Sequence, residues 1–537
     1  MPERLCGLQR LAMFLSAAIV AAVLFASGLA FAAGQSGEMG EAEGGRTHNL
    51  PLGDHASNST SPVQQIAADP VVYTDTRPAK GLSGGEESSD QAADSDIAQP
   101  RAILRECQAN YVTGGEAPAN PQGAVSALRL VVTTKKEIAV INRNDCSTIS
   151  KLFVPSFFAL QFPAAASQSF KSARVIYDFG SQRFFLSAMA VAPDGKDTFF
   201  YFAVSTSNTA AAWRIFRIGL KVGGAARCIP TVDGAWGSPN PGVNSRRWLV
   251  SGTQSSPQGR VSGSIMSLEK EPTLSIIGMP KFHCFNGLDA YLAPPIVRGT
   301  MTTAYFLSVG AVSGNTVRRY ALETAGAVVD DTIIGGGPTA INIPAWTAPP
   351  EVPQPNGQEL FASEGEFSAP TVQVGPFLWN VHTVNVNGKA RWRLYKLPQM
   401  GTDPLFVFTP STSLGLHHTF SASVATGSAN ADAPAFVTFT RVRSGNVGGR
   451  PELMMAKGPN SSAAGWVSTM VERSPSQFEL AAPGVTCNSD SLPRACRWAE
   501  HSSTQMDPAN GTRAWGLSEL AVGTGQGDWT VRAGQIE

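Results

Sequence analysis

Two aspartates at turn-like positions are the first residues of this chain whose type indicates acid–base chemistry. Asp178 lies shortly before the run RFF, and Asp507 lies shortly before RAW. Two carboxyl groups held about 5 to 10 Å apart can act as the acid and the base that cleave a glycosidic bond. The alternative, which we favour, is that each carboxylate accepts backbone hydrogen bonds within its own turn.

A denser polar set occurs near the C-terminal end, where Glu500, His501 and Glu519 fall within one group of expected strands. These three side chains are candidates for a ligand-binding cluster, although a solvated strand face has the same composition. Trp379 and His382 lie on another expected strand and are candidates for a pocket that faces a central channel. For this pair we favour the packing of a buried tryptophan beside a hydrogen-bonded histidine.

Motifs that would fix a particular reaction are missing or badly placed. The one G-x-S-x-G sequence is GLSGG at 81–85, in a segment too polar to form the strand, turn and helix that a nucleophilic serine requires. His417 and His418 are adjacent, so on a strand their side chains point to opposite faces and do not converge on one metal ion. There is no CxxC and no HExxH motif. We therefore predict no metal site and no cofactor.

The elements that must position these residues are short strands. Glycine occurs 53 times, proline 37 times, and charged residues make up 15% of the chain, so the long amphipathic stretches of helical proteins are missing. From residue 101 onward β-branched and aromatic runs recur, each ended by Gly, Asn, Asp or Pro. The fold class predicted from this pattern is all-β.

Several runs predict particular strands. RVIYDF, RFFLSAMAVA, TFFYFAVSTS and WRIFRIGL predict a four-stranded meander, and Asn387-Gly388 between two later runs predicts a tight hairpin turn. ISKLFVPSFF is expected to continue an earlier group of strands. Another group is expected to consist of RWLVSGTQ, RVSGSIMSL and TLSIIG.

The runs fall into about seven groups of roughly 60 residues, which predicts a β-propeller of about seven four-stranded blades. A single four-stranded sheet cannot bury both of its faces, whereas radial stacking of such sheets buries both and leaves only short edges. Residues 497–520, RWAEHSSTQMDPANGTRAWGLSEL, are then expected to form a strand pair of the closing blade, with tryptophans packed between blades. Two tandem β-sandwiches, separated by the Pro-rich connector at 335–357, are the alternative.

One segment resembles a known kind of propeller. MAVAPDGKDTFFYFAV, residues 189–204, is similar to the Pro-Asp-Gly-Lys turn and aromatic strand in blades of many secreted and periplasmic β-propellers. It also resembles a degenerate Asp-box of sialidase-like propellers, since it keeps Asp194, Thr198 and the aromatic Phe199, although Lys196 replaces the glycine. The resemblance implies a propeller fold. Sialidase activity would require three arginines and a Tyr–Glu pair, and this set cannot be placed on the sequence.

The N-terminal segment predicts export. Arg4 and Arg10 precede 23 uncharged residues that contain the small-residue pattern Ala30-Phe31-Ala32. We predict a signal peptide over residues 1–32 and no membrane span in the mature chain, with an uncleaved anchor as the alternative. Residues 33–100 contain 11 acidic and 3 basic residues, which predicts a disordered acidic leader before a propeller domain over 101–537.

Six cysteines follow the predicted cleavage site, at positions 107, 146, 228, 284, 487 and 496. In an exported chain an even number predicts disulfides, and six cysteines allow 15 pairings. Cys487 and Cys496 flank a short polar loop and are the one pair that the sequence singles out. We expect a secreted, extracellular or cell-surface location, with the periplasm as an alternative compartment.

The charge pattern argues against nucleic acid as a partner. Residues 101–537 carry 36 basic and 29 acidic residues, and their basic clusters are only pairs such as Arg246-Arg247. We expect a monomeric binding module for an extracellular glycan or a surface protein. A glycoside hydrolase or lyase of sialidase-like type is one alternative, and a structural surface or adhesion component is another. Two carboxyl groups that converge in one cleft would distinguish the enzyme from the binding module.

Overall fold

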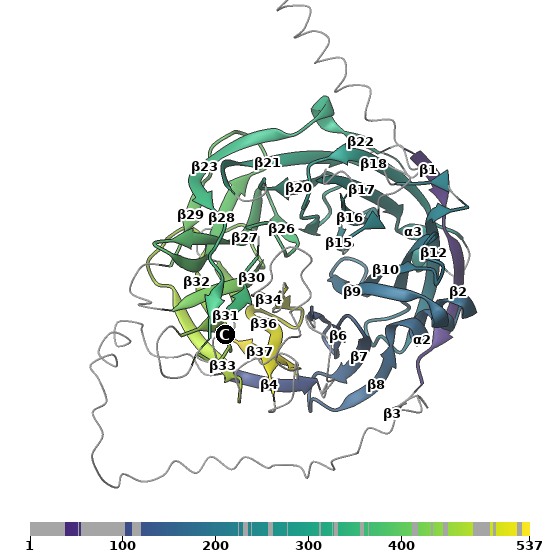
Figure 1. The fold of residues 1–537 in the computed structure, drawn as a ribbon, viewed down its shortest axis with the longest axis horizontal. Helices are drawn as coiled ribbons and strands as arrows, with labels where there is room; N and C mark the ends of the chain where they lie inside the picture. Colours follow the sequence, from purple (N-terminus) through teal and green to yellow (C-terminus); the bar gives the residue numbers. More distant parts are fainter. Residues whose placement is uncertain are drawn as a thin grey trace, which may run out of the picture.

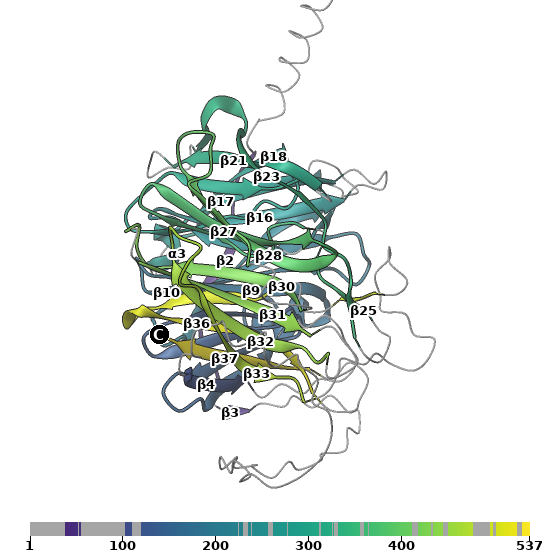
Figure 2. The same ribbon diagram turned by 90° about the vertical axis from the view of Figure 1, so that its left-hand side faces the viewer.

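In a computed structural model, the chain forms an almost entirely β structure, arranged as a ring of sheets around a central axis (Figure 1). Viewed from the side, strands of successive sheets lie one below another (Figure 2). The predicted all-β propeller is therefore confirmed, and two tandem sandwiches are excluded. The structure describes residues 38–51, 53–54, 103–109 and 120–537, with gaps at 224, 229–234, 238, 256–260, 276–277, 311–312, 325, 327–330, 355–358, 364, 411–416, 431–432, 444–448, 476–494, 498–500 and 523–528. The predicted signal peptide lies outside these residues.

Five sheets of four to six strands form separate blades, and within them most consecutive strands pair antiparallel, although β23 pairs with β21. In chain order the first two contain β5 (Gln122–Val125), β6 (Arg129–Thr133), β7 (Glu137–Asn142) and β8 (Thr148–Phe153) with β3 (Gly53–Asp54), and β9 (Ser169–Asp178), β10 (Arg183–Val191), β11 (Thr198–Ser205) and β12 (Ala212–Val222) with β13 (Ala225–Ala226) and β2 (Glu43–Asn49). The other three contain β20 (Ala304–Ser308), β21 (Ser313–Glu323), β22 (Thr332–Ile333) and β23 (Thr339–Thr347); β30 (His418–Thr426), β31 (Pro434–Val442), β32 (Glu452–Pro459) and β33 (Val467–Arg473); and β35 (Ser503–Asp507), β36 (Asn510–Ala521), β37 (Trp529–Ile536) and β4 (Ile103–Ala109).

An eleven-stranded sheet joins two further meanders through parallel pairing of β15, β19 and β26 near the axis. Its strands are β1 (Glu38–Glu41), β14 (Ala235–Trp236), β15 (Asn240–Val243), β16 (Arg247–Ser255), β17 (Val261–Glu269), β18 (Lys281–Leu288), β19 (Pro295–Arg298), β26 (Thr371–Val374), β27 (Phe377–Val386), β28 (Lys389–Pro398) and β29 (Phe406–Phe408). A three-stranded sheet consists of β24 (Val352–Pro353), β25 (Glu359–Phe361) and β34 (Ala495–Arg497). The predicted count of seven blades is not confirmed by these sheets, because two of the meanders share one sheet.

The strand predictions hold for the meander β9–β12 and fail where proline intervenes. The second half of ISKLFVPSFF is the helix α2 (Val154–Ala159), and TLSIIG begins within the helix α3 (Glu271–Leu274). In both helices proline occupies the first turn, where its fixed φ suits a helix and its missing N–H breaks no strand ladder. The strand that follows α3 is β18, which the sequence pattern missed. The 3-10 helices are η2 (Pro163–Ser167) and η3 (Ile334–Gly336). No helix in the described ranges is both long and apolar enough to cross a bilayer.

The apolar core is divided into clusters that lie between neighbouring sheets. Leu130 and Ile141 of the first sheet pack against Trp515 and Val531 of the last sheet, so a tryptophan of 497–520 packs between blades as predicted. Strands with sheets on both sides, such as β10, are buried along almost their whole length. The outer strand β23 instead alternates between exposed and buried residues. This difference explains why β10 reads as a continuous apolar run, RFFLSAMAV.

The ring is closed by β4, which precedes the first blade in the sequence and pairs with β37 of the last. The disulfide Cys107–Cys146 joins β4 to the turn after β7, and Cys228–Cys284 joins the second blade to β18. Two disulfides fit an oxidising compartment. The predicted Cys487–Cys496 bridge lies outside the residues whose side chains are described.

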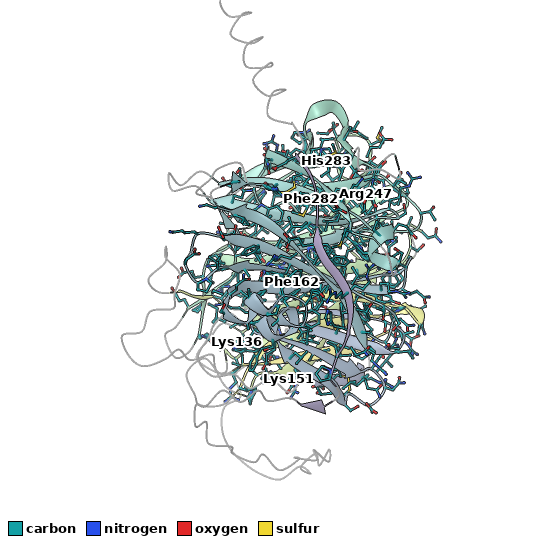
Figure 3. All side chains as sticks on the ribbon, turned by 90° about the vertical axis from the view of Figure 1, so that its right-hand side faces the viewer. Lys136, Lys151, Phe162, Arg247, Phe282 and His283 are labelled. Carbon is teal, nitrogen blue, oxygen red and sulfur yellow. A yellow bond between two sulfur atoms is a disulfide. The ribbon has the colours of Figure 1, made fainter. Side chains whose placement is uncertain are left out.

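Part of the expected disordered leader is ordered strand. β1 pairs with β18 and β2 pairs with β12, so residues 38–49 add a strand to the outer edge of two meanders (Figure 3). A Cβ at Gly40 would overlap the ring of Phe282, and one at Gly44 would come within 2.7 Å of Phe162. Glycine is therefore required for this close approach. The polar, Gly-rich composition of residues 38–49 indicated disorder and gave no sign that they pair with β18 and β12.

Two predicted turns have the expected geometry. Asn387 and Gly388 join β27 to β28 with φ of 52° and 75°, the positive values that a two-residue hairpin turn of type I′ needs. The Pro-Asp-Gly-Lys segment joins β10 to β11, where Gly195 has φ of 71° and the Lys196 N–H donates to Asp194 Oδ1 at 2.9 Å. These local signals were sufficient to place both hairpins.

Candidate functional site

A cleft of about 880 Å³ opens at the ends of several strands on one side of the ring. It is lined by the β9–β10, β15–β16 and β19–β20 turns and by the β17–β18 connection that contains α3. Its lining includes three carboxylates and three cations, so the cleft carries both signs of charge equally. These residues are Asp178, Glu269, Glu271, Arg246, Arg247 and Lys270.

Asp178 and Lys270 form a buried ion pair at this cleft, with 2.5 Å between Asp178 Oδ2 and Lys270 Nζ. The Asp178 carboxylate also accepts the N–H groups of Gly180 at 3.1 Å and Ser181 at 2.9 Å. Lys270 Nζ donates a further bond to the Asn244 carbonyl at 3.1 Å. Asp178 thus fixes its own turn, as the favoured interpretation expected, and connects that turn to the next meander.

Most of the other charged groups of the cleft are also paired. Arg247 binds the buried carboxylate of Asp331, with 3.1 Å between Nη2 and Oδ1. Glu269 Oε2 accepts the Lys281 N–H at 3.0 Å. Glu271 is exposed in the first turn of α3. The cleft therefore presents charged groups whose orientation is already fixed within the protein, together with one solvated carboxylate.

A second, narrower cavity of about 50 Å³ lies on the central axis. Its lining comes from β5, β9, β19, β26, β30 and β35, and four of these are the innermost edge strands of their sheets. The Ser423 hydroxyl lies there 2.8 Å from the Ser502 hydroxyl and 2.8 Å from the Thr504 hydroxyl. The Gln505 side chain bonds to the backbone of Val125. These polar groups connect neighbouring blades around the axis.

A buried polar cluster is formed by residues next in sequence to Val175, Ala369 and Ser502 of the cavity wall. The Arg174 guanidinium, on β9, contacts Asn240 Oδ1 and donates to Nε2 of His501. His501 Nδ1–H donates to the Ser368 carbonyl at 3.0 Å, so the ring is the neutral tautomer. Burial and the neighbouring Arg174 hold the pKa of His501 well below its usual value. The cluster joins β9 to β15 and to the segments that precede β26 and β35.

An arginine lines the axial cavity itself. Arg298, the last residue of β19, stacks on the ring of Phe179 with 3.4 Å between its Cζ atom and the ring centroid. Burial lowers its pKa to about 10. Among the described residues no carboxylate lines this cavity.

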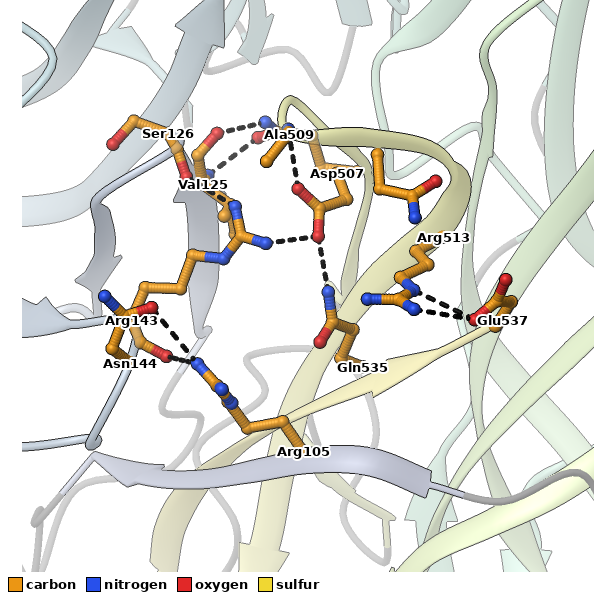
Figure 4. Close-up of polar contacts among 12 residues, drawn as sticks. Arg105, Val125, Ser126, Arg143, Asn144, Asp507, Ala509, Arg513, Gln535 and Glu537 are labelled. Carbon is orange, nitrogen blue, oxygen red and sulfur yellow. Dashed lines mark hydrogen bonds and ion pairs between the residues drawn. The ribbon is translucent and has the colours of Figure 1, made fainter.

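Asp507 lies apart from Asp178, at the end of β35 before the turn to β36, so the structure does not join the two aspartates in one cleft. Its carboxylate accepts the Ala509 N–H at 2.8 Å and contacts Arg143 and Gln535 (Figure 4). The Arg143–Asp507 pair is buried and joins the last sheet to the first. Asp507 therefore stabilises its turn and the closure of the ring.

The remaining candidates occupy several different places. Trp379 is fully buried between blades with Lys396 Nζ 5.3 Å from its ring centroid, and His382 bonds to the Gly365 carbonyl and the Tyr395 hydroxyl. Both match the packing interpretation, and neither lines the axial cavity or the cleft.

Glu519 is buried on β36 and also lies away from both cavities. Glu500 lies outside the described residues. His418 is buried on β30 and accepts the Ala390 N–H, and in the described ranges no group of His, Cys, Asp and Glu is arranged for a metal ion.

Sequence reasoning missed Arg174 and Arg298. Both follow or interrupt apolar strand runs, in SARVIYDF and PPIVRG. A charged residue within a run that must be buried on both faces is a signal for a specific polar role, because an unpaired buried charge is costly. That signal was present in both runs.

No protein-family model matches the chain, and no curated protein matches it. Among solved structures, it is similar to the GH93 α-L-arabinofuranosidase of Fusarium graminearum, with 11% identity over 82% of this chain and 98% of that chain and a TM-score of 0.32. It is also similar to a protein of unknown function from Dyadobacter fermentans, with 9% identity over 81% of this chain and 98% of that chain and a TM-score of 0.35.

A third similar structure is the subtype N10 neuraminidase-like protein of A/little yellow-shouldered bat/Guatemala/060/2010, with 8% identity over 64% of this chain and 96% of that chain and a TM-score of 0.34. At such identities and scores, likeness carries no information on the ligand or the reaction of this chain.

Proposed function

We propose that this protein is an exported, monomeric β-propeller that binds carbohydrate in the cleft beside α3. The observation that carries this proposal is the lining of three carboxylates and three cations, most of them already paired. Sugar hydroxyls both donate and accept hydrogen bonds, so a neutral polyhydroxylated ligand matches a wall of fixed donors and acceptors of both kinds. An ionic ligand would instead favour a wall of one sign.

The size of the cleft favours a glycan over a protein partner. Ligand pockets usually measure about 300 to 1,000 Å³, and this cleft measures about 880 Å³. A protein partner would need a flat surface of roughly 800 Å² on each side. The backbone turns at Gly180, Gly278 and Gly299 that line the cleft also allow a ligand to approach the main chain closely.

Binding is favoured over hydrolysis because two of the three carboxylates are engaged in bonds that fix the fold. Asp178 is held by Lys270 and by its own turn, and Glu269 accepts a backbone N–H. An acid–base pair needs two carboxyl groups that can exchange protons with the substrate. Glu271 is the one carboxylate of the cleft that is solvated, and it would have to act alone.

The proposal is tested by incubating the full chain, with its disulfides formed, on a broad array of neutral and acidic glycans. We expect retention of the protein on a set of neutral glycans and no released sugar. Release of sugar that is lost in Glu271→Gln would assign the cleft to a glycoside hydrolase instead. Retention only on acidic glycans would contradict the balanced charge of the cleft, and the absence of retention on all glycans would refute the proposal.

We also infer that the ring has seven blades. The support is the chain order of antiparallel meanders: five form separate sheets, and β15–β18 and β26–β29 form two more within the eleven-stranded sheet. In this interpretation β15, β19 and β26 are the innermost strands of adjacent blades. They lie close enough at the axis to form parallel backbone hydrogen bonds with one another. Cleavage of the signal peptide after Ala32 stays a prediction, checked by N-terminal sequencing of the exported chain.

A further inference from the structure

The axial cavity differs from the cleft in size and in charge. Its volume is about 50 Å³, and one water molecule needs roughly 10 to 15 Å³ of such space. The cavity therefore accommodates a ligand of a few heavy atoms. Apolar side chains such as Val175, Ile296 and Met506 supply most of its wall, so each polar group that faces it is conspicuous.

The Arg298 guanidinium is a cation in this wall with no hydrogen bond or ion pair to any other described residue. Phe179 covers one face of the guanidinium, at 3.4 Å between Cζ and the ring centroid. Stacking leaves the N–H groups at the edge of the guanidinium available, since they lie in its plane. Burial without a counter-charge is costly for a cation, and the lowered pKa of Arg298 reflects that cost. A bound anion would offset it.

Gln122 supplies a second polar group to the same cavity. Its side chain, at the start of β5, is buried with 4% exposure, and its Oε1 atom has no hydrogen-bond partner. Buried amide groups are rarely left without partners, because burial removes them from water without replacing the lost hydrogen bond. The Gln122 Oε1 acceptor therefore has an unmet hydrogen bond, which a ligand that reaches it from this cavity would satisfy.

Several other polar groups of the wall are already engaged. Gln505 bonds through both its Oε1 and Nε2 atoms to the backbone of Val125, and the Ser503 hydroxyl accepts the Gly123 N–H at 2.9 Å. The Ser423 hydroxyl bonds to the hydroxyls of Ser502 and Thr504. Arg298 and Gln122 are thus left for recognition, one a cationic donor and the other a neutral amide, and Tyr177 lines the same wall.

We propose that the axial cavity binds a small free carboxylic acid of two or three carbons, with its carboxylate on Arg298 and its second polar group on the Gln122 amide. A guanidinium matches a carboxylate with two parallel N–H donors, and such charge-assisted bonds are roughly twice as strong as neutral ones. The unpaired Gln122 Oε1 acceptor favours an acid that also carries a hydroxyl donor. A hydroxy acid such as glycolate has both groups and the size of the cavity.

The test measures thermal unfolding of the full chain against increasing sodium glycolate, acetate and glucuronate, with ionic strength held constant by a bulky buffer anion. Glycolate should raise the midpoint with saturation, acetate should bind more weakly, and glucuronate should have no specific effect because it is too large for the cavity. Saturation by glucuronate at a lower concentration than by glycolate would overturn the proposal and assign the site to an acidic sugar.

Variants locate the effect. Arg298→Met keeps the stacking volume but removes the charge, and should weaken glycolate binding at least tenfold; Gln122→Met should reduce it severalfold and abolish the preference over acetate. Arg513→Met, at a partly exposed ion pair with Glu537, is the matched control and should bind as the native chain does. An equal response of the Arg298→Met chain, or no response of the native chain, would refute the site.

If Arg298→Met does not fold, Arg298→Lys keeps the charge but presents no planar pair of donors, and should also weaken binding. Glycolate binding of native strength in that variant would contradict recognition by the guanidinium. Thr300→Trp, which fills the separate cleft, should leave glycolate binding unchanged. Glycolate binding in the axial cavity is therefore tested independently of carbohydrate binding in the cleft.

Discussion

Acidification is expected to destabilise the propeller through His382, a buried histidine on β27. Its Nδ1–H donates to the Gly365 carbonyl at 2.5 Å, and its Nε2 accepts from the Tyr395 hydroxyl at 2.8 Å. Burial, with a smaller effect of Arg393, lowers the pKa of His382 from 6.5 to about 3. The folded chain therefore holds this ring neutral under conditions in which the unfolded chain protonates it.

The sign and the size follow from this difference. Between pH 6.5 and pH 3 the unfolded state binds more protons, so stability falls as the pH falls through that window. A pH of 5 lies about 1.5 units below the ordinary pKa of histidine. Protonation of the unfolded chain at this pH therefore lowers the free energy of unfolding by about 2 kcal/mol. At pH 7 and above, His382 contributes almost no pH dependence.

The assay is urea unfolding of the native chain and of His382→Gln at pH 8, 7, 6 and 5. Glutamine keeps hydrogen-bonding groups but does not titrate. The variant should be less stable than the native chain at pH 7, because it loses the packing of the ring against Trp346 and Phe367. The difference in unfolding free energy should stay constant from pH 8 to pH 7 and shrink by about 2 kcal/mol at pH 5. A difference that stays constant down to pH 5 would refute the buried neutral histidine.

Three further changes test the packing. Glu452→Ala should destabilise the protein by about 3 to 5 kcal/mol, because the buried carboxylate lies 2.5 Å from Arg441 Nε and 2.6 Å from Arg473 Nε and its loss leaves Arg441 unpaired; urea unfolding measures this, and a loss under 1 kcal/mol would contradict it. Cys107→Ser with Cys146→Ser should lower the unfolding free energy by about 4 kcal/mol from loop closure, and reductant should then shift the variant less than the native chain. Gly40→Val should release residues 38–49 to limited proteolysis because the new side chain overlaps Phe282, whereas equal protection would argue against the strand β1.

Local signals made much of the fold predictable. Asn387-Gly388, the Pro-Asp-Gly-Lys turn and the runs of β9–β12 each depend on residues close in sequence, and the structure confirms them. Prolines within ISKLFVPSFF and before TLSIIG were the local signals that should have predicted helical turns. The ordered segment 38–49 was hidden because its pairing depends on distant rings, not on its own composition.

The candidate sites were less predictable, since they consist of contacts between distant parts of the chain. Arg247 and Asp331 are 84 residues apart, and Arg174 and His501 are 327 apart. Residue type did identify Asp178 and His501 as positions of interest, but their partners decide their roles. Arg298 needed the topology of the ring, which alone places the end of β19 on the axis.

Binding of a neutral glycan in the cleft beside α3 can be tested by a single comparison of variants. Calorimetric titration of the best-retained glycan would be made against the native chain and Thr300→Trp, whose indole fills the cleft from the exposed β19–β20 loop. Thr339→Trp, on the exposed outer strand β23, is the matched control. We expect Thr300→Trp to abolish binding and Thr339→Trp to preserve it. Equal affinity of the native chain and Thr300→Trp would rule out this cleft as the glycan site.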